Sequence, residues 1–190
     1  NSTAVGYQAL HNTTTGGYNT AVGQNALGTN TTGQYQTAVG QGALFASNAD
    51  NNSAFGVSAL SSCSTGVHNT AMGRNAATSL TTGTNNTAVG ENALTANTTG
   101  TNNVAVGANA LDANTTATSN TAIGFAALTA NTTGARNTAV GQDTLYANTT
   151  ANDNTAIGFQ ALVANTTGAQ NIAIGVYAAD ALTTGDDNVS

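Results

Sequence analysis

The stretch NTAVGENALTANTTGTN, residues 86–102, contains every feature that decides the fold of this chain. Its pattern, N-T-A-V-G-x-x-A-L-x-A-N-T-T-G-x-x, recurs along all 190 residues. The glycine that follows alanine and a large apolar residue occurs eleven times, spaced by 17 residues except for 16 between Gly40 and Gly56. A fixed short period indicates a repeat architecture. We therefore expect residues 1–190 to be a single repeat array, and, since it starts and stops in mid-repeat, to be cut from a longer protein at both ends.

The T-A-V segment of each repeat predicts a short β-strand. Side chains alternate along a strand, so threonine and valine share one side and alanine lies on the other. We interpret the residue before glycine as a core position, which places Val22 and Val89 in the core. The invariant alanine on the opposite side predicts a neighbouring chain pressed close to it. Glycine then allows a tight corner, and ANTTG supplies turn residues.

A second apolar position follows four residues after the glycine and is usually leucine, as in Leu27 and Leu94. Two repeats have alanine there instead, and both gain a leucine three residues later, as Leu80 and Leu182. Because a packed interior tolerates swaps that conserve volume, both sites are predicted to point into the coil. The later site is usually asparagine, which predicts an internal ladder of stacked amides. Cys63 occupies the same site, so we expect a buried and inert thiol.

These features favour an all-β fold in which each repeat winds once around a parallel β-solenoid. A helix fits poorly, because the repeat is rich in glycine, asparagine and β-branched residues and lacks a 3.6-residue period. Equivalent positions of successive coils would stack about 4.8 Å apart. Such a coil is thin, so we expect several copies of the chain to associate side by side.

Composition excludes several classes of function. Charged residues make up 5% of the chain, which has two arginines, no lysine and a net charge of −6. This charge balance argues against nucleic-acid binding and against attachment to anionic membrane surfaces. No apolar run approaches the length of about 20 residues that spans a membrane, so no membrane segment is predicted. A single cysteine permits no internal disulfide.

The segments NVAVG, residues 103–107, and NIAIG, residues 171–175, resemble the head repeats of YadA-type trimeric autotransporter adhesins. The NTAIGxxAL pattern is also similar to arrays in phage and bacterial trimeric fibre proteins. The resemblance implies a left-handed parallel β-roll, which with the eleven repeats would have about eleven coils, a homotrimeric fibre, and a location outside the cell or on a virion surface. It implies a role in attachment or as a spacer. The repeat here is longer than the adhesin unit by the ANTTG loop.

Residues that contact a ligand are expected at positions that vary between repeats. Aromatic side chains on a polar, weakly charged rod can contact glycans or a receptor protein. The candidate surface contacts are Tyr18, Tyr35, Phe45, Tyr146, Arg74 and Arg136. His11 and His68 have no second ligand at metal-binding spacing, and no acid–base constellation occurs. We therefore expect neither an enzyme nor a cofactor or metal site.

Two alternatives to an attachment fibre stay open. Rows of threonine from successive TT pairs predict an ice-binding solenoid, although adjacent threonines point to opposite faces and leave one outward row. Stacked asparagine and threonine with low charge also suit a self-assembling, amyloid-like filament.

Overall fold

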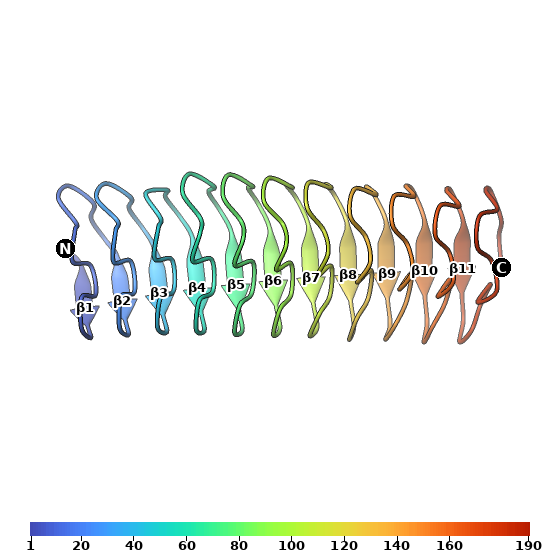
Figure 1. Cartoon of the computed structure of the whole chain (residues 1–190), viewed down its shortest axis with the longest axis horizontal. Coiled ribbons are helices and arrows are strands. Elements are labelled where there is room, and N and C mark those ends of the chain that lie inside the picture. The colour runs from blue at the N-terminus through green and yellow to red at the C-terminus, as the bar shows by residue number, and fades with distance from the viewer.

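The computed structural model describes residues 1–190 as an elongated rod of stacked coils, with the two termini at opposite ends (Figure 1). Each coil contributes one three-residue strand, and the eleven strands form a single sheet in chain order. The strands are β1 (Thr3–Val5), β2 (Thr20–Val22), β3 (Thr37–Val39), β4 (Ser53–Phe55), β5 (Thr70–Met72), β6 (Thr87–Val89), β7 (Val104–Val106), β8 (Thr121–Ile123), β9 (Thr138–Val140), β10 (Thr155–Ile157) and β11 (Ile172–Ile174).

The strand register follows the sequence repeat. Every neighbouring pair is parallel, and Thr87 of β6 lies opposite Val104 of β7, 17 residues later. Across the short repeat, Thr37 lies opposite Ser53, so the missing residue is absorbed outside the strands. The prediction of an all-β parallel solenoid with one repeat per coil is therefore confirmed.

The predicted phase of the strand is wrong. Alanine, the middle residue, points into the coil and is fully buried in β2 to β11, as in Ala21 and Ala88. Val22 is 36% exposed and Val89 is half-buried, so neither belongs to the core. The reason is the thinness of the coil: opposite the strand, the interior already holds a second alanine, a leucine and amide side chains. Only a methyl group fits in the space left, so the alanine faces its own coil and not a neighbouring chain.

The leucine predictions are confirmed. Leu27 and Leu94 are fully buried, and Leu80 is fully buried beside Ala77, which is 1% exposed. Leu182 is half-buried and packs against the same core, since only one side of the last coil is covered by another coil. The leucine that moves by three residues thus fills the interior of its coil.

Two ladders of buried side chains run along the rod. The turn ladder occupies the predicted site, where Asn114 donates from Nδ2 to Asn97 Oδ1 at 3.2 Å, and Asn131 donates likewise to Asn114. The pattern continues through Asn148 and Asn165. The internal amide ladder is therefore confirmed for these coils. Ser47, Cys63 and Leu80 interrupt it in three successive coils.

The second ladder, here called the strand ladder, consists of the residue before each strand. Asn103 Nδ2 donates to Asn86 Oδ1 at 3.2 Å and to the Ala117 carbonyl at 2.8 Å. The backbone N–H of Asn103 donates to the same Asn86 oxygen at 3.0 Å. Each amide thus ties its own strand to the coils before and after it. Buried polar groups cost free energy unless they are hydrogen-bonded, and this geometry satisfies them.

The corner after each strand requires glycine. Gly90 has φ +134°, and a Cβ there would lie 2.5 Å from the Gly107 carbonyl oxygen of the next coil. Other corners place non-glycine residues in the left-handed region, including the buried leucine, with φ +57° at Leu94. These corners turn the chain sharply enough to close a coil in so few residues.

Candidate functional site on the lateral surface

The variable positions of the repeat lie on the outside of the rod, where the structure places all four candidate aromatic residues. The rings of Tyr18 and Tyr35, from adjacent coils, are parallel within 3° and have centroids 5.1 Å apart. The Phe45 ring lies over Gly28, where an added Cβ would come within 3.0 Å of it. All four are exposed. Tyr18 and Tyr35 therefore pack against each other, and Phe45 packs against Gly28 of the preceding coil. Tyr146 instead lines a surface hollow, which is described below.

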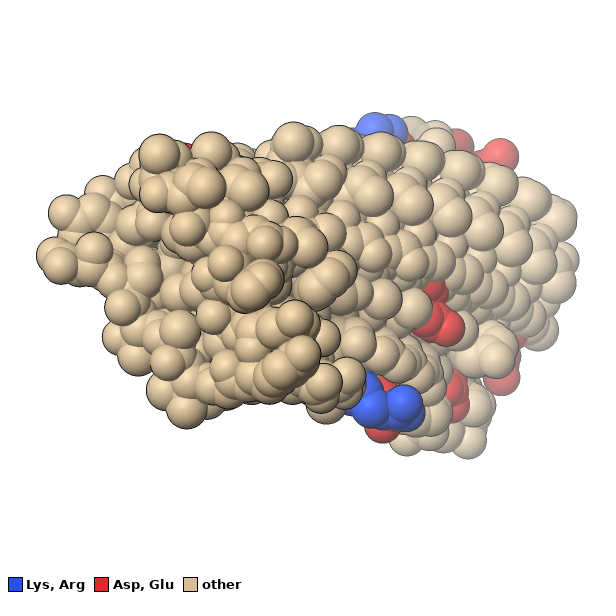
Figure 2. All heavy atoms as spheres, turned by 60° about the vertical axis from the view of Figure 1, so that its left-hand side comes forward, with Lys and Arg blue, Asp and Glu red and all other residues tan.

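Both candidate arginines are engaged in ion pairs with an acidic residue of the next coil. Arg74 pairs with Glu91, and Arg136 forms two hydrogen bonds with Asp153, at 2.6 and 2.7 Å. The hydrogen bond and charge of Arg136 hold the pKa of Asp153 below its usual value. Because of these ion pairs, neither arginine is free to bind an anion. Residues 1–49 contain no charged side chain, and Figure 2 shows an uncharged surface at the end of the rod nearest the viewer.

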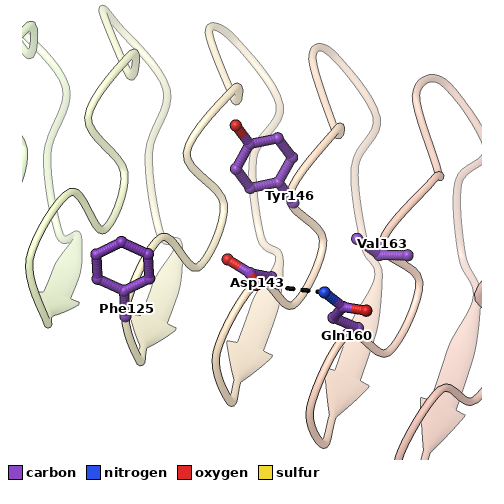
Figure 3. Close-up of a pocket in the computed structure, with 5 residues that line it drawn as sticks. All are labelled: Phe125, Asp143, Tyr146, Gln160 and Val163. Carbon is purple, nitrogen blue, oxygen red and sulfur yellow. Dashed lines mark hydrogen bonds between the residues drawn. The ribbon is translucent and has the colours of Figure 1, made fainter.

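A surface hollow of about 430 Å³ lies over the coils of β8, β9 and β10. It is lined by side chains from the turns that follow these strands, with Phe125 and Tyr146 as its aromatic members (Figure 3). Asp143, Gln160 and Val163 complete the lining. Ligand sites usually combine apolar or aromatic walls with a few polar groups, and this hollow has that composition.

The Asp143 carboxylate is the central polar group of the hollow. Gln160 Nε2 donates to Asp143 Oδ2 at 3.4 Å, and Gln142 Nε2 donates to the same oxygen at 3.1 Å. No protein donor contacts Oδ1, and no arginine neutralises the carboxylate. Asp143 lies at the corner after β9 with φ +53°, in the left-handed region. The hollow thus offers one charged acceptor, flanked by amides and by the rings of Phe125 and Tyr146.

Sequence reasoning placed Tyr146 among the candidate contacts but did not group it with its neighbours in the hollow. Asp143 and Gln160 occupy the same repeat position in successive coils, and Tyr146 and Val163 do likewise. Residues 17 apart are side by side on this rod, so reading the sequence in columns of the repeat would have brought these four together. Phe125 enters from the preceding coil at the neighbouring repeat position.

The expected inert cysteine is buried. Cys63 is fully inaccessible to solvent, and its Sγ lies 3.3 Å from the Gly66 carbonyl oxygen. Burial raises the pKa of the Cys63 thiol to about 11, while the backbone hydrogen bond to Gly66 opposes part of that rise. A thiol with this pKa is a poor nucleophile at neutral pH. No group of three His, Cys, Asp or Glu side chains is arranged to hold a metal ion.

The fold defines this chain as a parallel β-solenoid repeat protein. Comparison with protein-family models gives no match, and comparison with curated proteins gives none either. None of its segments forms a helix that is both long and apolar enough to cross a membrane.

Proposed function

We propose that this chain is a segment of an extracellular attachment fibre in which copies pack side by side, as a homotrimer, through the strand face. The strand face consists of the first and third residues of each strand, which point away from the coil. The proposal draws on the rod shape, on the variable lateral surface, and on the resemblance of the NVAVG and NIAIG segments to trimeric fibre repeats. The number of copies and the location outside the cell rest on that resemblance.

One observation carries the proposal: large apolar side chains form an uninterrupted row along the strand face. The row consists of the third residue of each strand, and its members include Met72, which is 47% exposed, and Ile123, which is 40% exposed. Monomeric soluble proteins rarely leave large contiguous apolar patches in water. Burying such a row gives about 25 cal/mol for each Å² removed from water, which favours association. The full row is Val5, Val22, Val39, Phe55, Met72, Val89, Val106, Ile123, Val140, Ile157 and Ile174.

Sedimentation equilibrium of the purified chain tests this function. We expect a discrete trimer that dissociates only on dilution or in denaturant. A monomer at every concentration would overturn the proposal. Open polymers that lengthen with concentration would overturn it in favour of a self-assembling filament.

Ice binding is a second candidate, because the strand face also carries a row of hydroxyl groups. The first strand residue is threonine in eight of the eleven strands, beside the apolar row. In the TT pairs, by contrast, the hydroxyl of the first threonine forms a hydrogen bond to the next coil, as where Thr98 Oγ1 donates to the Thr115 carbonyl at 3.2 Å. An ice-binding face must be free, whereas a trimer interface buries it. A monomer with thermal hysteresis would support ice binding, and a trimer without it would exclude that function.

A further inference from the structure

We propose that the hollow formed by Phe125, Asp143, Tyr146, Gln160 and Val163 binds a neutral saccharide. This inference deepens the proposed attachment function and rests on it for its purpose, since it names the ligand class that the fibre would attach to. The volume of the hollow, about 430 Å³, is within the range of small-molecule sites. Its position on the turns leaves it outside the strand face, so association through that face does not use these residues.

The lining matches the chemistry of a sugar ring. A pyranose presents apolar C–H groups on one face and hydroxyl groups at its edge. The rings of Tyr146 and Phe125, 45% and 52% exposed, provide flat apolar surfaces for the C–H face. Oδ1 of Asp143 is free to accept from sugar hydroxyls, and hydrogen bonds to a charged acceptor are stronger than neutral ones. The Gln160 carboxamide, which can both donate and accept, lies beside it.

Charge selects a neutral sugar over an acidic one. Asp143 has no arginine partner, both arginines are paired elsewhere, and the net charge is −6. A sialic or uronic acid would bring its carboxylate to this negative surface without a cation to receive it, which is unfavourable.

A quaternary ammonium ion would suit the charge, but such ligands are recognised by aromatic cages. Here the two rings come from different coils and border an open hollow, which suits a flat ring better (Figure 3).

The repeat itself supplies variants that are compatible with the fold. Asparagine occupies the position of Asp143 in other coils, as at Asn92 and Asn109, with the same positive φ. Threonine occupies the position of Tyr146 in others, as at Thr95. Asp143→Asn and Tyr146→Thr therefore remove the charge and the ring without introducing a residue that is foreign to the coil.

The matched control is Phe45→Thr. Phe45 has the same repeat position as Tyr146, but Gly42 stands where Asp143 would be. The control thus removes an exposed aromatic ring from the same repeat position, in a coil that has no carboxylate beside the ring.

The experiment is a titration of the assembled chain with methyl glycosides of neutral hexoses and N-acetylhexosamines, followed by NMR. Glucuronate, sialic acid and tetramethylammonium serve as comparison ligands. We expect saturable shifts at Asp143, Tyr146 and Gln160 with at least one neutral sugar and none with the acidic sugars. Tyr146→Thr and Asp143→Asn should each weaken binding about tenfold, the loss of one good contact, and Phe45→Thr should leave it unchanged.

Three results would overturn the saccharide site: no neutral sugar binds, binding is unaffected by both hollow variants, or only tetramethylammonium binds. The oligomeric state is read from the mass of the same samples. A trimer that binds no sugar contradicts this inference alone, whereas a monomer that binds sugar contradicts the proposed assembly alone.

Discussion

The buried leucine occupies an unusual backbone position for a bulky side chain. Leu94 has φ +57°, in the left-handed region, where a non-glycine residue costs about 1–3 kcal/mol. Fully burying a leucine side chain returns about 1.5–3 kcal/mol, so the two effects are of similar size. Ala77 keeps the same corner, with φ +50°, although its side chain fills less space. The backbone conformation at this corner is therefore set by the closure of the coil. The apolar side chain that fills the interior can come from this position or from the position three residues later, as with Leu80.

This exchange of volume predicts strong coupling between residues 77 and 80. Ala77→Leu alone should destabilise the chain by about 1–3 kcal/mol, because Leu80 already fills the space. Leu80→Asn alone should cost about 2–5 kcal/mol through the cavity that it leaves. The double variant restores the common repeat and should lie within about 1 kcal/mol of the original protein. Urea denaturation of all four proteins gives the cycle, and simple additivity would show that the two sites do not share one space.

Cys63 makes stability depend on pH in a defined window. Its pKa is about 11 in the folded chain, against an ordinary value of 9.0. Between these values the unfolded chain loses the proton and the folded chain keeps it, so stability should fall as pH rises from about 9 to 11 and be unaffected by this group below 9. Denaturant midpoints across this range, compared with Cys63→Ser, measure the effect. Equal slopes for the two proteins would contradict it.

At the scale of the element, side-chain amides join each coil to its neighbours in addition to the backbone hydrogen bonds and the apolar core. One leucine and two alanines fill a typical coil, while two asparagines bridge to adjacent coils. The third coil departs from this design. Gln36 replaces the strand-ladder asparagine, Ser47 replaces the turn-ladder asparagine, and both polar groups are buried without a hydrogen-bond partner. In other coils, such as those of Asn103 and Asn114, the asparagines at these two sites are hydrogen-bonded.

Restoring both ladders should therefore stabilise the protein. Gln36→Asn combined with Ser47→Asn recreates the common pair and should raise the free energy of unfolding by about 1–3 kcal/mol, the cost of leaving buried polar groups unpaired. The mirror variant, Asn86→Gln, should destabilise a coil whose ladder is complete. Thermal or urea unfolding measures both. An unstable double variant would show that the shorter third repeat cannot align the amides.

The sequence determines the coil and the register because both depend on the repeat period, which is visible in residues alone. It also reveals the turn ladder, since the exchange at Leu80 marks that site as internal. The strand phase was not predictable in the same way. Alternation places Val22 and Ala21 on opposite sides, but hydrophobicity favours burying valine. The correct choice requires the space inside the coil, which depends on Leu27 and on the amides across from the strand.

At the scale of the whole molecule, the same correction changes which surface is available for assembly. Because alanine points inward, the first and third residues of each strand point outward. The third residue is large and apolar in every strand, and the first is β-branched or carries a hydroxyl group. The surface that varies between coils, including the hollow over β8 to β10, lies on the turns instead. A repeat of this kind can therefore keep one face constant for self-association while the turns diverge. This separation leaves room for a local hollow in a few coils without disturbing the rod.

The strand face gives the last prediction. Val106→Thr with Ile123→Thr keeps β-branched residues in β7 and β8 but replaces apolar surface with hydroxyls. We expect the rod itself to tolerate both changes, since the side chains point outward, while the assembly dissociates at a higher protein concentration and melts at a lower temperature than the original protein at equal concentration. Val163→Thr, which lies in the hollow and off the strand face, is the control and should leave assembly unchanged. Differential scanning calorimetry over a wide concentration range measures the effect. If the double variant melts and sediments as the original protein does, the strand face is not the interface.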